Sequence, residues 1–204
     1  MSANKPYIIG VTGGIGCGKT EAAAFLESLG AARVDADAIS RSLTAPGGEA
    51  LPALRERFGD GVVVPDGTLN RAALAAIVFQ SQPERRALEG ILHPLIQKNA
   101  WHQIEAAGER GEKIVILDVP LLFVTGMDVL CDETWSMTAD PETQLSRVME
   151  RGLTREQAQA RIDSQMSADE RNGRATRVIR TDRSMDRTRA ELSGLYQQAL
   201  RRLG

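Results

Sequence analysis

The chain has 204 residues, of which 42% are hydrophobic and 25% charged, and its formal net charge is −2 at pH 7. This length suits one α/β core with insertions, while the near-neutral charge gives no general attraction to nucleic acid or membrane and no apolar run approaches the length of a membrane span. Because only Cys17 and Cys131 are present and the first residues lack a signal-peptide pattern, we expect no disulfide framework and a soluble, cytoplasmic protein.

The segment 13–20, with the sequence GGIGCGKT, matches the phosphate-loop pattern G-x-x-x-x-G-K-[ST] in full. It follows an apolar stretch at 7–12, which predicts a buried strand, and precedes a helical pattern that ends at Gly30. The glycines let successive N–H groups converge on phosphates at a helix N-terminus. A Gly-rich turn without a ligand is the alternative. We expect Lys19 to reach the β- and γ-phosphates and the Thr20 hydroxyl to bind Mg²⁺.

Two carboxylates follow the second predicted strand, at 31–35. Asp35 and Asp37 lie at its carboxyl end, where open α/β sheets bind ligands. One of them would serve as a general base; the alternative is that Asp35 only caps the next helix.

A long helical insertion separates these carboxylates from the next clear strand. Helical periodicity covers 49–58 and 71–79, and a longer helix is predicted over 83–107, interrupted or kinked at His93-Pro94 because proline cannot donate the ladder hydrogen bond. An insertion in this position suggests a substrate-binding subdomain. Taken alone, His93 is more typical of a packed or capping histidine than of a catalyst.

The apolar run at 113–118 predicts a parallel strand covered on both faces, and it ends in Asp118. This acid occupies the Walker-B position, near Mg²⁺ and the γ-phosphate. Further strands are predicted at 133–137 and 178–179, before a closing amphipathic helix.

Short helices between 141 and 174 carry an excess of arginine. Asp140-Pro141 predicts one helix start, and capping boxes at 154–157 and 167–170 predict two more. The arginines resemble those of a mobile lid that closes over a polyphosphate, although a solvated face with weak Glu–Arg pairs is the alternative. They are Arg147, Arg151, Arg155, Arg161 and Arg171.

At this point the motifs resemble those of the dephospho-coenzyme A kinase family, in the family's order and from about residue 7 to 180. The segments that carry the resemblance are TGGIGCGK at 12–19, DAD at 35–37, DGTL at 66–69, HPLI at 93–96, PLLF at 120–123 and PETQLSR at 141–147. The resemblance implies ATP-dependent phosphorylation of the ribose 3′-hydroxyl of dephospho-CoA, the last step of coenzyme A biosynthesis, with Mg²⁺. The expected partners are these two small molecules, with no nucleic acid or membrane. We expect a monomer, with weak self-association left open.

The fold that the resemblance implies is an α/β P-loop kinase with a parallel β-sheet flanked by helices. Its nucleotide core would span about 5–37, 109–140 and 175–204, its helical acceptor-binding insertion about 38–108, and its helical lid about 141–174.

The resemblance also implies roles for individual residues. Lys19, Asp37 and Arg151 would be catalytic, with Asp37 as the base on the acceptor hydroxyl, Asp35 second to it, and Arg151 as the lid arginine at the transferring phosphoryl group. The expected ATP-binding residues are Gly13, Gly14, Ile15, Gly16, Cys17, Gly18, Lys19, Thr20, Glu21 and Arg147. The expected acceptor-binding residues are Asp35, Asp37, His93 and Leu121. Thr20 and Asp118 would hold the metal, partly through water.

Three positions depart from the family's pattern. Glu21 stands where a second Ser or Thr is usual, Val124 replaces a common glutamate, and the turn at 180–183 has the sequence RTDR instead of an Asn/Gly-containing one. The turn leaves the contacts to adenine undefined.

Two other functions fit part of the pattern. A small kinase of the same architecture would phosphorylate a nucleoside monophosphate or another metabolite. A nucleotide-dependent switch would hydrolyse ATP or GTP slowly, although the chain has no Asn-Lys-x-Asp guanine signature.

Overall fold

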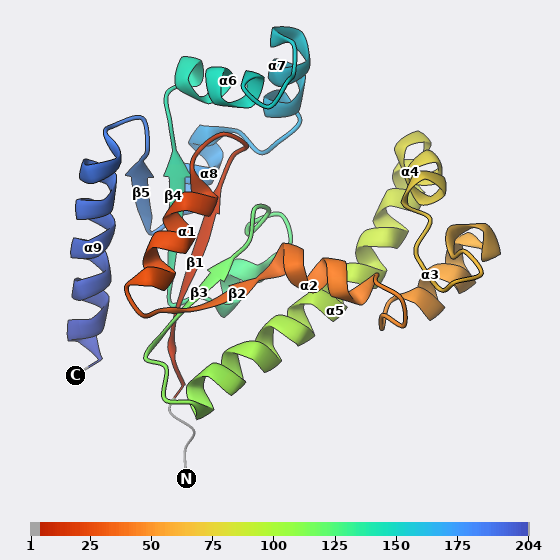
Figure 1. Cartoon of the computed structure of the whole chain (residues 1–204), viewed down its shortest axis with the longest axis horizontal. Helices are drawn as coiled ribbons and strands as arrows, with labels where there is room; N and C mark the ends of the chain where they lie inside the picture. Colours follow the sequence, from red (N-terminus) through yellow and green to blue (C-terminus); the bar gives the residue numbers. More distant parts are fainter. Residues whose placement is uncertain (1–4, 204) are drawn as a thin grey trace. The chain divides into compact units, whose positions relative to one another are not determined.

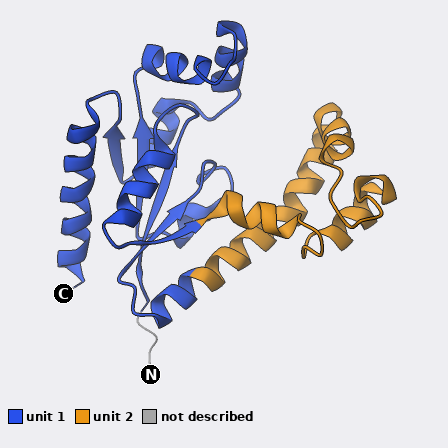
Figure 2. Cartoon of the chain, in the orientation of Figure 1, with its two compact units in different colours: residues 1–34, 104–204 blue, residues 35–103 orange. Residues whose placement is uncertain are grey.

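The computed structural model describes residues 5–203. The chain forms two compact units, one comprising residues 1–34 and 104–204 and the other residues 35–103 (Figure 2). We call them unit 1 and unit 2. Within the described part of the chain, no helix combines the length and apolar character that crossing a membrane would require.

Unit 1 contains the sheet and most of the helices (Figure 1). Its elements are β1 (Tyr7–Gly13), α1 (Lys19–Ser28), β2 (Ala32–Asp35, whose last residue begins unit 2), β3 (Ile114–Asp118), η2 (Met127–Leu130), β4 (Glu133–Thr138), α6 (Pro141–Met149), α7 (Arg155–Asp163), α8 (Ala168–Arg174), β5 (Arg177–Arg180) and α9 (Met185–Arg202). Each strand expected from the sequence is therefore present.

The five strands form one sheet in the order β2-β3-β1-β4-β5. The central strand β1 runs parallel to both neighbours, with Val11 opposite Asp118 on β3 and Gly13 opposite Met137 on β4. Parallel strands bring their carboxyl ends to one edge of the sheet, so the loop after β1 lies beside the end of β3.

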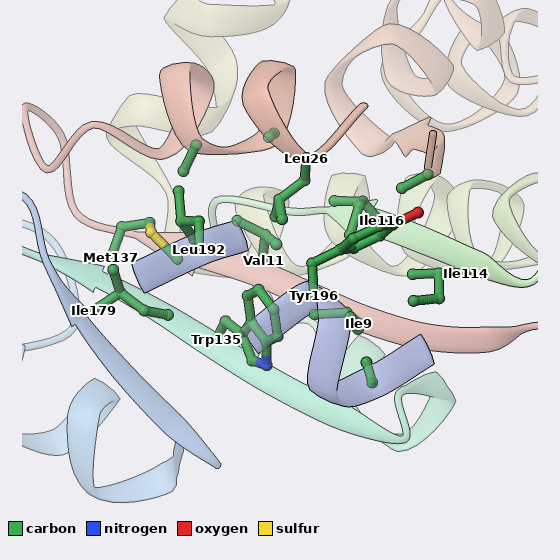
Figure 3. Close-up of a cluster of buried hydrophobic side chains, with 14 of the residues drawn as sticks. Ile9, Val11, Leu26, Ile114, Ile116, Trp135, Met137, Ile179, Leu192 and Tyr196 are labelled. Carbon is green, nitrogen blue, oxygen red and sulfur yellow. The ribbon is translucent and has the colours of Figure 1, made fainter. Parts of the chain in front are cut away.

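One face of this sheet packs against α1 and α9. Alternate strand residues, among them Ile9, Ile116 and Trp135, meet Leu26 of α1 and Tyr196 of α9 in a single buried cluster (Figure 3). The helix that follows β1 and the last helix of unit 1 therefore share one apolar core with the sheet.

The short helices of the 141–174 segment begin as the sequence predicts. Asp140 accepts a hydrogen bond from the Thr143 N–H at 2.9 Å, ahead of Pro141. Thr154 and Gln157 form a reciprocal capping box at the start of α7. Local side-chain chemistry therefore defines these helix ends.

Unit 2 is helical, with α2 (Ala36–Leu43), α3 (Leu51–Phe58), η1 (Asp60–Val62), α4 (Arg71–Gln80) and most of α5 (Gln82–Glu109). Its small core centres on Leu51, Val62, Val63 and Leu74.

The longer helix predicted over 83–107 is confirmed as α5, and its interruption at His93-Pro94 is wrong, because α5 is one helix with Pro94 inside it. The alternative of a kink at this point stays a prediction. Leu88, packed against the core of unit 2, and the fully buried Ala100 flank the proline along the helix. Their burial compensates for the one ladder hydrogen bond that Pro94 cannot donate.

Candidate functional site

The loop between β1 and α1 has the backbone geometry of a phosphate-binding loop. Gly16 and Gly18 have φ angles of 78° and 74°, in the left-handed region that favours glycine. A Cβ at Gly13 would lie 2.9 Å from the Met137 carbonyl oxygen, so β4 also requires a glycine there. In the described structure, no side chain caps the start of α1 at Lys19. The N–H groups of its first turn are therefore suited to bind an anion.

Lys19 and Asp118 meet as an ion pair between the first residue of α1 and the last residue of β3. The Asp118 side chain is only 1% exposed. Its second oxygen, Oδ2, accepts hydrogen bonds from Nε and Nη2 of Arg33 at 3.1 and 2.5 Å. Two cations therefore share one buried carboxylate beside the loop.

Two glutamines hold the backbone of Ile15 in the middle of the loop, and we call them the amide clamp. Gln165, after α7, accepts from the Ile15 N–H at 2.9 Å through Oε1. Gln144, on α6, donates to the Ile15 carbonyl oxygen at 2.8 Å. The Ile15 side chain packs against the apolar cluster that joins α6 and α7. These helices thus support the loop directly.

Thr181 and Arg147 support the second half of the loop. The buried Thr181 hydroxyl donates to the Cys17 carbonyl oxygen at 3.0 Å. Arg147 donates to Thr181 Oγ1 at 3.0 Å, to its carbonyl oxygen at 2.7 Å and to the Gly16 carbonyl oxygen at 3.3 Å. The atypical turn at 180–183 is therefore part of the loop's support.

Arg171, on α8, is a buried cation beside the loop. It is 5% exposed, and a Cβ added at Gly14 would lie 3.3 Å from its Nη2. Burial lowers the pKa of its guanidinium. One nitrogen donates to the Met166 carbonyl oxygen at 3.1 Å, whereas Nε has no hydrogen-bond partner among the described residues. Burial also raises the pKa of the Cys17 thiol, against the opposing charge of Arg171.

A cavity of about 470 Å³ opens next to the loop in unit 1. Five residues expected at the nucleotide line it together: Gly16, Gly18, Glu21, Arg147 and Arg151. The other residues around it are Ala22, Phe25, Glu150, Thr181, Arg183, Met185, Thr188, Arg189 and Leu192. The phosphate loop, the arginines and the first turns of α9 therefore line the same cavity.

The oxygen donors expected for Mg²⁺ are the Thr20 hydroxyl and the Asp118 carboxylate. Thr20 is the second residue of α1 and is exposed, whereas Asp118 is buried and paired with Lys19 and Arg33. Hard oxygen ligands suit Mg²⁺, so this donor set fits the ion chemically. Over residues 5–203, no three His, Cys, Asp or Glu side chains group as a metal site.

The residues expected at the acceptor are divided between the units. Asp35 caps α2, accepting from the Ala38 N–H at 2.9 Å, and Asp37 is exposed in the same helix's first turn. His93 is half-buried on α5, also in unit 2. Leu121 belongs to unit 1, where it is 46% exposed and lines a small crevice with Gly14 and Arg171.

A family model described as dephospho-CoA kinase matches residues 7–187. The chain belongs to the dephospho-CoA kinase family. It is 46% identical over 193 residues to a dephospho-CoA kinase of Symbiobacterium thermophilum, covering 94% of this chain and 81% of that one.

Two solved structures resemble this chain in fold. TT1252 from Thermus thermophilus has a TM-score of 0.79 and 33% identity, covering 95% of this chain and 97% of its own. The dephospho-CoA kinase from Campylobacter jejuni has a TM-score of 0.64 and 25% identity, and the match covers 96% of this chain and 98% of that one. The predicted family, the P-loop kinase fold and the kinase activity are thereby confirmed. Members of the family phosphorylate dephospho-CoA with ATP in the last step of coenzyme A biosynthesis.

Four residues that hold the loop or the neighbouring Asp118 in place were not among the site residues predicted from the sequence. They are Gln144, Gln165, Thr181 and Arg33. Gln144 could have been found, because it lies one helical turn before Arg147 on the same predicted helix. Thr181 lies in the turn at 180–183 that departs from the family's pattern, but its contact with Cys17, like those of Gln165 and Arg33, joins residues far apart in the sequence.

Proposed function

We propose that the chain transfers the γ-phosphoryl group of ATP to the ribose 3′-hydroxyl of dephospho-CoA, with the nucleotide bound by the loop and the adjoining cavity of unit 1. The observation that carries this assignment is that the cavity is lined both by loop glycines and by Arg147 and Arg151. A polyphosphate bound there would meet backbone N–H groups on one side and guanidinium groups on the other.

Phosphoryl transfer demands alignment of two substrates and neutralisation of charge on the transferring group. Lys19 contacts the β- and γ-phosphates, and Arg151 contacts the transferring phosphoryl group. Arg171 adds a buried positive charge beside Gly14, and its Nε, which has no hydrogen-bond partner within residues 5–203, supports a role in binding an anion. These groups contribute through position and electrostatics.

Asp37 accepts the proton of the acceptor hydroxyl, and Asp35 holds the start of α2. This division is supported by the exposure of Asp37 and by the capping bond of Asp35. A general base typically contributes about 10²–10⁴-fold, or some 3–5 kcal/mol, whereas positioning can supply roughly 7–11 kcal/mol. Alignment by unit 1 therefore outweighs the base.

Thr20 and Asp118 would hold Mg²⁺, partly through water, and the bound ion would neutralise phosphate charge. Thr20 is exposed and available to a ligand. Asp118 keeps its place through Arg33.

The insertion at about 38–108, with His93, binds dephospho-CoA, with Leu121 as a further acceptor contact. The segment at about 141–174 acts as a lid over the nucleotide. We further propose a monomer that works in the reducing cytoplasm, where the thiols of Cys17 and Cys131 stay free.

The test is ADP release from ATP in the presence of Mg²⁺ with dephospho-CoA, AMP, dTMP or no acceptor, with products identified by mass. We expect turnover only with dephospho-CoA, which gains one phosphate. Turnover with another acceptor instead would retain the kinase and overturn the substrate. Equal ATP hydrolysis without any acceptor would overturn the kinase and favour a nucleotide switch.

A further inference from the structure

Arg33 lies on the edge strand β2, next to β3 in the sheet. Its side chain is 20% exposed and reaches Asp118 at the end of β3. The contact uses two nitrogens, Nε at 3.1 Å and Nη2 at 2.5 Å from Oδ2. This geometry fixes the carboxylate by one oxygen and leaves the other, Oδ1, to Lys19.

The charges around Asp118 are unevenly placed. Lys19 and Arg33 bring two positive charges to one carboxylate that is 1% exposed. Arg33 also lies near Glu27, whose Oε2 is 3.8 Å from Nη1 and whose side chain is 53% exposed. Because solvent screens Glu27, Arg33 interacts more strongly with Asp118 than with Glu27.

The Lys19 ammonium has three N–H donors, and the one given to Asp118 Oδ1 is not available to phosphate oxygens, so a phosphate that takes all three donors loosens this pair. A buried carboxylate that loses its only cation is strongly destabilised, because it keeps its desolvation penalty without compensation. Arg33 removes this obstacle, since its two hydrogen bonds to Oδ2 remain when Lys19 moves.

We infer that Arg33 is the permanent counter-ion of Asp118, and that it lets Lys19 pass from Asp118 to the nucleotide phosphates. Arg33 is thus a positioning residue, which acts on the nucleotide through Asp118 and Lys19. The inference rests on the proposed roles of these two residues. It predicts that, once Lys19 has moved away, another cation bound at Asp118, such as Mg²⁺, takes over part of the role of Arg33.

The experiment compares ADP affinity by calorimetry, on the full chain, in EDTA and in Mg²⁺. Arg33→Met keeps the apolar stem and removes the charge. We expect it to weaken ADP binding about tenfold in EDTA and only about threefold or less in Mg²⁺. Arg33→Lys should recover most of the loss. The matched control is Glu27→Gln, which removes an exposed acid near Arg33 and should leave ADP affinity unchanged.

A double-mutant cycle separates this inference from the proposed function. In a Lys19→Ala background there is no lysine to release, so Arg33→Met should add little further loss of ADP affinity. If Lys19→Ala alone leaves ADP affinity unchanged, the proposed role of Lys19 fails. If the cycle shows full additivity, the inference about Arg33 fails and the role of Lys19 stands.

A purely structural role for Arg33 would give a different result. Arg33→Met would then lower the melting temperature while the folded protein bound ADP as the original chain does, or lost affinity equally in EDTA and Mg²⁺. Either result would overturn the inference. If Arg33→Met does not fold, the same comparison with Arg33→Lys decides, with an expected loss of about threefold in EDTA and none in Mg²⁺.

Discussion

The phosphate loop of unit 1 and the residues of unit 2 that we propose bind the acceptor are held in very different ways. The loop backbone is bonded by side chains from distant parts of the chain: the amide clamp, Thr181 and Arg147. In unit 2, Asp35 accepts a hydrogen bond from the Ala38 N–H in the first turn of its own helix, and Asp37 is exposed. The ion pair between Glu49 and Lys98 there is about half exposed as well.

This difference teaches where each substrate's binding energy would come from. A loop fixed by hydrogen bonds from distant side chains presents its remaining N–H groups without further ordering, so little entropy is lost on binding phosphate. The exposed groups of unit 2 are solvated, and under the proposed function they would gain contacts when the acceptor binds. Mutations in unit 1 should therefore change mainly the binding of the nucleotide, and mutations in unit 2 mainly the reaction of the acceptor.

The largest effect is expected at the rigid side of this comparison. Lys19→Ala removes the cation that neutralises phosphate charge, and we expect kcat to fall by at least about 10³-fold with dephospho-CoA and ATP. Steady-state kinetics on folded protein, checked by circular dichroism, provide the measurement. A loss below tenfold would contradict the role of Lys19.

The acceptor side should respond less strongly. Asp37→Asn removes the proposed base and should lower kcat by about 10²-fold, at the low end of the range for general bases. A greater loss than that of Lys19→Ala would reverse the weighting of alignment over base catalysis. Asp35→Asn is the matched control, because asparagine also caps helices well. If it costs more activity than Asp37→Asn, the base is Asp35.

A single hydroxyl in the support of the loop offers a finer test. Thr181→Val loses the bonds to Arg147 and to the Cys17 carbonyl oxygen, and we expect an increase of about tenfold in the KM for ATP and a stability loss of about 1–2 kcal/mol. Thr44→Val makes the same change at a buried threonine of unit 2, where Arg71 donates to the hydroxyl at 2.9 Å. It should cost similar stability and leave the KM for ATP unchanged. Equal KM effects would erase the distinction between the units.

The smallest effect concerns acid sensitivity. Hydrogen bonds from Arg180 hold the pKa of the Asp182 carboxyl at about 2, below its ordinary 3.8. A depressed pKa stabilises the fold above the unfolded value, and this stabilisation is lost as pH falls towards 2. The difference in urea midpoint between the original chain and Asp182→Asn should therefore shrink by about half from pH 6 to pH 3.

Glu49→Gln is the control for this pH effect in unit 2. Hydrogen bonds from Lys98 and Asn99 lower the pKa of Glu49, but its side chain is 45% exposed. We expect a smaller change of the midpoint with pH, because solvent screens this pair. A pH-independent difference for Asp182→Asn would contradict the depressed pKa.

Sequence predicts the features of this protein that depend on neighbouring residues. The loop at 13–20, the cap at Asp140 and the capping box at Thr154 are each encoded within a few positions, and the structure contains all three. The long helix over 83–107 is predicted as well, but the local pattern leaves open whether Pro94 interrupts it, because burial on both sides of the proline also contributes to its continuity.

The residues that support the site could not be predicted, because they contact residues far away in the sequence. The bond from Ile15 to Gln165 joins residues 150 positions apart, and that from Thr181 to Cys17 joins residues 164 apart. Arg33 and Asp118 are separated by 85 positions. In the sequence, Arg33 resembles any surface arginine, and only the order of strands in the sheet brings it to a buried acid. The catalytic and acceptor roles of individual residues remain predictions.

The amide clamp also bears on the design of inhibitors. Through Gln165 the loop has an internal competitor, tethered to the same chain and therefore present at a high effective concentration. A neutral fragment that offers one carbonyl oxygen to the Ile15 N–H only replaces one amide by another and gains little. A compound that brings negative charge to several N–H groups at once gains much more. Gln165 therefore disfavours the binding of small uncharged compounds at the Ile15 N–H.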